Sequence, residues 1–76
     1  MVRAYILIEM AAGHARNLVD SLEGQPGVVG VARVTGPYDV IAVLEAEDVE
    51  KISDTLSEMV HPREGVLRTT TCVSIG

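Results

Sequence analysis

Residues 28–46 read VVGVARVTGPYDVIAVLEA, two β-rich runs that flank a turn. The first run, Val28–Thr35, contains five β-branched residues, which favour extended backbone. Gly36–Asp39 is typical of a turn, because proline presets a turn dihedral and glycine is free to take a positive φ. The second run, Asp39–Ala46, resumes the strand pattern. We therefore predict an antiparallel hairpin in the middle of the chain.

On the N-terminal side of this hairpin, the sequence predicts one strand and one helix. Ala4–Met10 is rich in Ile, Leu and Tyr, which is typical of a strand. From His14 onward the apolar spacing becomes that of one helical face, with its members at Ala15, Leu18, Val19 and Leu22. Two glycines and a proline within Gly24–Gly27 end this helix.

On the C-terminal side, a second helix and a last strand follow. Asp48 has the right side chain to cap the helix start. The buried stripe of this helix is predicted to comprise Val49, Ile52, Leu56, Met59 and Val60. His61 precedes Pro62, and a residue before proline avoids helical backbone, so the helix ends there. Leu67–Ile75 is the last strand.

The resulting order, βαββαβ, predicts one α+β domain over residues 1–76 with a ferredoxin-like fold. A four-stranded antiparallel sheet carries both helices on one face. A chain of 76 residues buries only about 60% of its unfolded surface, and a single cysteine forms no internal disulfide. We therefore expect self-association to add stability.

The sheet face turned away from the helices carries too many apolar residues for a surface in water. Strict alternation along the strands places six of them there: Tyr5, Leu7, Val29, Val31, Ile41 and Val43. It places Arg33 on the same face. Exposing all six would forfeit on the order of 10 kcal/mol. We predict a homodimer that pairs these faces, a dimeric α+β barrel; the alternative is a face half covered by its own long side chains.

The charge balance argues against nucleic acid as a partner. Six Lys and Arg stand against eleven Asp and Glu, which gives a net charge of −5, and no two basic residues are adjacent. Binding to nucleic acid draws most of its affinity from clustered basic residues that neutralise phosphates. Only Tyr5 and Tyr38 could stack on a base. We expect no direct contact with DNA or RNA.

Other classes are excluded by what the sequence lacks. No stretch approaches the roughly 20 apolar residues of a membrane span, and the first residues do not follow the order of a signal peptide. The lone Cys72 suits a reducing compartment, so we expect a cytoplasmic protein without membrane contact. His14, His61 and Cys72 are scattered, which predicts no metal site. No phosphate loop or catalytic set of side chains is present, so we expect no cofactor and no enzyme.

The turn Thr35–Val40 (TGPYDV) resembles the T-G-x-Y-D turn of the C-terminal module of the Lrp/AsnC family. This module is called the RAM domain, for regulation of amino-acid metabolism. The resemblance covers nearly the whole chain and continues at Gly27-Val28, Asp48-Val49 and the run from Gly65-Val66 through Arg68 and Thr69 to Thr71. Because no helix-turn-helix precedes the module, the chain looks like its stand-alone form.

This resemblance implies a ferredoxin-like fold, dimers that pair through their sheets, and assembly of dimers into octamers. It also implies that a free amino acid or similar small effector binds near the hairpin turn, where dimers meet. The implied role is regulatory, in amino-acid metabolism, and full-length Lrp/AsnC regulators are implied partners. An effector that favours one arrangement of dimers over another would be coupled to the oligomeric state by linkage.

The candidate ligand-binding residues lie in the turn and in the last strand. Asp39 is an anion suited to accept from an α-ammonium group, and the amides of Gly36, Tyr38 and Asp39 could donate to an α-carboxylate. Pro37 offers no amide. The resemblance adds the hydroxyls of Thr69 and Thr71, two residues apart on one face of a strand. The alternatives are turn capping for Asp39 and simple β-propensity for the threonines.

Three other function classes stay open at this stage. Small dimeric α+β barrel enzymes, such as monooxygenases and isomerases, share the topology but usually enclose a pocket with aromatic and histidine side chains. A ligand-free assembly partner of full-length regulators would need only the shared sheet surfaces. The amino-acid-binding ACT domain shares the fold and reads its ligand in the loop after the first strand, here Ala11–His14.

Overall fold

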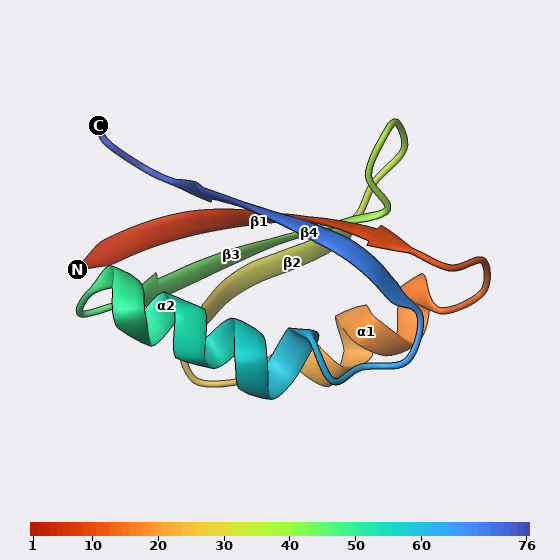
Figure 1. The fold of residues 1–76 in the computed structure, drawn as a ribbon, viewed down its shortest axis with the longest axis horizontal. Helices are drawn as coiled ribbons and strands as arrows, with labels where there is room; N and C mark the ends of the chain where they lie inside the picture. Colours follow the sequence, from red (N-terminus) through yellow and green to blue (C-terminus); the bar gives the residue numbers. More distant parts are fainter.

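A four-stranded antiparallel sheet carries both helices on one of its faces (Figure 1). This computed structural model describes residues 1–76. In chain order the elements are β1 (Val2–Met10), α1 (Ala15–Leu22), β2 (Val28–Arg33), β3 (Val40–Ala46), α2 (Val49–Thr55) with a final π-helical turn η1 (Leu56–Val60), and β4 (Val66–Val73). The strand order is β2-β3-β1-β4, and every neighbouring pair is antiparallel. The predicted α+β, ferredoxin-like fold and its central hairpin are confirmed.

The second helix follows the sequence prediction at its start and departs from it at its end. The Asp48 carboxylate accepts a hydrogen bond from the Lys51 amide at 2.8 Å, so the predicted cap is confirmed. In the last turn the His61 amide donates to the Leu56 carbonyl five residues back, at 2.8 Å, which widens the turn into a π-helix. Neither α1 nor α2 is long and apolar enough to cross a membrane.

The hydrophobic core lies between the helices and one face of the sheet. Its twelve buried residues are Ala4, Ile6, Ile8, Met10, Leu18, Leu22, Val40, Ala42, Leu44, Ile52, Leu56 and Val60, and none of them is polar. The predicted stripe of α2 is wrong at Val49, whose side chain is 54% exposed. Val49 is the first residue of the helix and lines an open cleft with Met1 and Val73, where no further layer covers it.

A β-bulge in β2 changes which of its side chains face the helices. Val28 pairs with Leu44 and Gly30 pairs with Val43, so Val29 is one residue extra on β2. Cross-strand partners share a face, and Val31 pairs with the buried Ala42 and packs against the core. The prediction that Val31 lies on the outer face is therefore wrong.

The same shift applies to the end of β2. Arg33 pairs with the fully buried Val40, so Arg33 also belongs to the helix-facing side rather than to the outer face on which strict alternation placed it. Gly30 and Ala32 take the outer positions instead, opposite Val43 and Ile41. The bulge thus removes one valine from the outer face and brings one arginine to the side where α1 begins.

Candidate functional site

The hairpin turn between β2 and β3 is tied to the central strand β1 by Asp39. The Asp39 amide donates to the Ile8 carbonyl at 2.9 Å, and the Asp39 Oδ2 atom accepts from the Met10 amide at 2.8 Å. The carboxylate thereby extends the ladder between β1 and β3 by one rung. Asp39 is half-buried, and only one of its two carboxylate oxygens has a partner.

The turn offers fewer free amides than the sequence led us to expect. The Asp39 amide is occupied by Ile8, so its predicted donation to a ligand carboxylate does not fit this structure. The amides of Gly36 and Tyr38 have no partner within the chain. Gly36 has a φ of +110°, a backbone conformation that glycine adopts without strain.

A cleft of about 720 Å³ opens beside this turn, on the side where α1 begins. Its lining residues are Ala15, Arg33, Val34, Thr35 and Asp39. Of the predicted site residues, only Asp39 is among them. Arg33 is the residue that sequence reasoning missed, because its place depends on the bulge at Val29. The local signal that could have found this bulge is Gly30, since a glycine inside a strand often marks one.

The two candidate threonines lie elsewhere in the same chain. Thr69 pairs with Ile8 and Thr71 with Ile6, which turns both side chains to the helix-facing side at the free edge of β4. Because β1 separates β4 from β3, Thr69 is two strand spacings from Val40, roughly 10 Å. One chain therefore does not bring the threonines into the cleft at the turn.

Thr69 has His61 as a neighbour, a residue that was expected only to end the second helix. The His61 Nε2 atom lies 3.3 Å from the Thr69 Oγ1 atom, in reach of a hydrogen bond between η1 and β4. Thr69 is half-buried and His61 is exposed. The structure brings no three His, Cys, Asp or Glu side chains close enough together to hold a metal ion.

The loop after β1, where an ACT domain would read its ligand, is held against the start of β4. The Ala11 amide donates to the Gly65 carbonyl at 2.7 Å. Gly65 has a φ of +89°, and a Cβ atom there would lie 2.5 Å from the side chain of His14. The loop is thus packed closely against Gly65, while the larger cleft lies beside the hairpin turn.

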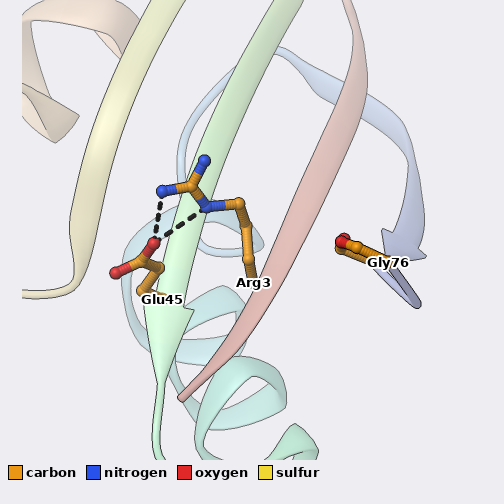
Figure 2. A network of polar contacts seen from close by, with 4 residues as sticks. Arg3, Glu45 and Gly76 are labelled. Carbon is orange, nitrogen blue, oxygen red and sulfur yellow. Dashed lines mark hydrogen bonds and ion pairs between the residues drawn. The ribbon is translucent and has the colours of Figure 1, made fainter.

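The outer face of the sheet has an apolar centre with an ion pair toward each end. At the centre, Tyr5 pairs with Val43 and Leu7 with Ile41 across β1 and β3. Toward one end, Arg3 Nε donates to Glu45 Oε2 at 2.8 Å, as Figure 2 shows, and this hydrogen bond is the main reason that the pKa of Arg3 is raised above its usual value.

At the opposite end of the same face, Glu9 and Arg68 approach to 3.5 Å between β1 and β4. Leu67, next to Arg68, is an extra residue in a second bulge and is 68% exposed. The four central side chains stay partly accessible: Tyr5 is 38% exposed, and Leu7, Ile41 and Val43 are half-buried. The outer face therefore has the composition of an interface core with a charged rim.

Comparison with known proteins identifies the relatives of this chain. A family model described as the Lrp/AsnC ligand binding domain matches residues 3–76. TTHA0845 from Thermus thermophilus is similar at 33% identity and a TM-score of 0.92, over 100% of this chain and 95% of that chain. FFRP-DM1 is similar at 29% identity and a TM-score of 0.90, over 99% of this chain and 100% of that one.

A longer protein shares the fold at lower identity. AsnC of E. coli is 17% identical with a TM-score of 0.88, and the match covers 99% of this chain but 51% of AsnC. This chain therefore spans about half the length of AsnC. Among curated proteins, none matches the chain significantly.

Proposed function

The chain belongs to the family of the Lrp/AsnC ligand-binding domain, and on that premise we propose that it is a regulatory module whose effector is an amino acid. The match over residues 3–76 is the observation that carries the proposal. The regulator NMB0573 from Neisseria meningitidis was solved as a complex with L-Met. It shares the fold at 19% identity and a TM-score of 0.85, over 99% of this chain and 50% of that chain, and its ligand supports an amino acid as the class of effector.

We propose that two copies pair through the outer face of the sheet and that these dimers assemble further. A second copy would remove Tyr5, Leu7, Ile41 and Val43 from water, and each such side chain gains up to about 1.5–3 kcal/mol from full burial. In the single chain both ends of this apolar centre carry an ion pair, so charged groups would lie at the rim of the contact.

The effector site proposed here is completed only where copies meet. Within one chain, Gly36, Tyr38 and Asp39 lie at the hairpin turn, whereas Thr69 and Thr71 lie beyond β1 at the opposite sheet edge. A neighbouring dimer that presents its β4 edge to the turn would bring the two halves together. Effector binding then stabilises that arrangement, which couples occupancy to oligomeric state.

We further propose that the module acts without catalysis and without touching DNA itself. All twelve core residues are apolar, so the interior between sheet and helices contributes no acid, base or nucleophile. The net charge of −5 disfavours contact with phosphates. Mixed oligomers with a full-length Lrp/AsnC regulator would supply the link to a promoter.

The test is calorimetric titration of the chain with each of the standard amino acids, with light scattering on the same samples. Binding of at least one amino acid and a change in mass are expected. Asp39→Asn removes the charge but can still accept from the Met10 amide, so it should keep the fold and weaken binding about 10- to 100-fold.

Asp48→Asn is the matched control, because the Asp48 carboxylate also accepts a hydrogen bond from one backbone amide and lies away from the cleft at the hairpin turn. It should leave binding unchanged. If no amino acid binds the unaltered chain at millimolar concentration and its mass stays constant, the proposed function is wrong.

A further inference from the structure

The guanidinium of Arg33 has no partner in the chain although it lines the cleft at the turn. The two ion pairs of the chain use Arg3 and Arg68, and none of its side-chain hydrogen bonds involves Arg33. A guanidinium presents five donors in a planar fork that matches a carboxylate. The side chain is exposed and remains available to a ligand.

The same cleft contains a charge of opposite sign that is not paired with Arg33. Asp39 lines the cleft with one carboxylate oxygen bound to the Met10 amide and the other without a partner. No ion pair joins Asp39 to Arg33. Two separated opposite charges in one cleft fit a zwitterion better than a simple anion or cation.

The start of α1 adds to the positive potential around Arg33. Ala15, the first residue of α1, lines the cleft. The first turn of this helix has no acidic residue, and His14 makes no side-chain hydrogen bond that would cap it. The positive end of the helix dipole therefore has no acidic partner within the first turn of α1 itself and favours an anionic group in the cleft.

We propose that Arg33 binds the carboxylate of the effector while Asp39 binds its ammonium group. This inference rests on the proposed function and assigns the main recognition of the carboxylate to a side chain. The turn amides offer less, because the Asp39 amide is occupied and Pro37 has none, which leaves those of Gly36 and Tyr38. The effector must then carry a free carboxylate beside a free amine. Arg33 is thus a specificity-determining residue that the bulge at Val29 turns toward the cleft.

The experiment compares the tightest-binding amino acid with its own α-carboxamide, which keeps the ammonium group and loses the carboxylate charge. The unaltered chain should bind the amino acid about 10- to 100-fold more tightly than the amide. Arg33→Gln should lose most of this preference, because it should weaken the binding of the amino acid and leave the binding of the amide unchanged. Arg33→Lys keeps the charge without the planar fork, so its preference for the amino acid should lie between those of the unaltered chain and Arg33→Gln.

Lys51→Gln is the control, because it also removes one exposed positive charge, at the start of α2 and at the end of the sheet away from the hairpin turn (Figure 1). Lys51→Gln should leave the affinities for the amino acid and for its amide unchanged. If the unaltered chain binds an amino acid but Arg33→Gln retains its affinity and its preference over the amide, the role of Arg33 is wrong while the proposed function stands. If the unaltered chain binds no amino acid, both fail.

Discussion

The two faces of the sheet come from alternate residues of the same strands, yet only one of them is completed within a single chain. On the helix-facing side, Ala4, Ile6 and Ile8 of β1 are fully buried. On the other side, Tyr5 and Leu7 of the same strand stay partly accessible. The two short helices cover one face, and no element of the single chain covers the other. The comparison teaches that one set of alternate positions builds the core of the single chain, while the other set is the surface that the proposed pairing would use.

The largest effect on stability should come from substitutions on the helix-facing side of the sheet. Ile6→Ala deletes methyl groups from the centre of the core and should lower the free energy of unfolding by about 2–5 kcal/mol. Leu7→Ala, one residue along β1, should cost clearly less in the monomer because its side chain is only half-buried. Urea unfolding at low protein concentration measures both. Equal losses would mean that the two faces are not distinct within one chain.

The next largest effect should appear in assembly. Leu7→Lys places a charge at the apolar centre of the outer face and should weaken self-association about 100-fold or more while leaving the circular dichroism of the fold unchanged. Ser53→Lys is the control, because it adds the same charge at an exposed position of α2, in the helical layer on the other side of the sheet. Sedimentation at several concentrations gives the mass of each variant. A monomeric parent chain would overturn the proposed pairing.

The smallest effect should reveal the bulge in β2. Val31→Asn should cost about 1–2 kcal/mol, because Val31 packs against the core. Ala32→Asn should cost less in the monomer, because Ala32 pairs with Ile41 on the outer face. Thermal unfolding of the two variants side by side checks the order. The reverse order would mean that the side chains of β2 alternate strictly and that Arg33 lies on the outer face.

Much of the fold follows from local patterns that the sequence displays directly. The 3.6-residue spacing of α1, the capping residue Asp48 and the turn at Gly36 each act over a few neighbouring positions, so each could be predicted. The π-helical turn η1 could not be predicted, because the helix ends with this turn and no further helical residue shows the shift in apolar spacing.

The candidate site could be predicted only in part. Asp39 was found from its turn, but its hydrogen bond to the Met10 amide joins residues 29 positions apart and could not be found locally. Thr69 and Thr71 were named from a family resemblance, and their separation from the turn depends on the strand order β2-β3-β1-β4. Arg33 was assigned to the wrong face.

The sequence by itself determined the order of the elements, the hairpin, the acidic charge and the turn that carries Asp39, because these depend on residue type and on spacing within one element. Only the tertiary structure decided which side chains share the cleft. One extra residue at Val29 reverses the alternation for the rest of β2, and such a bulge is defined by how β2 pairs with β3. That pairing turned Val31 into the core and Arg33 toward the cleft.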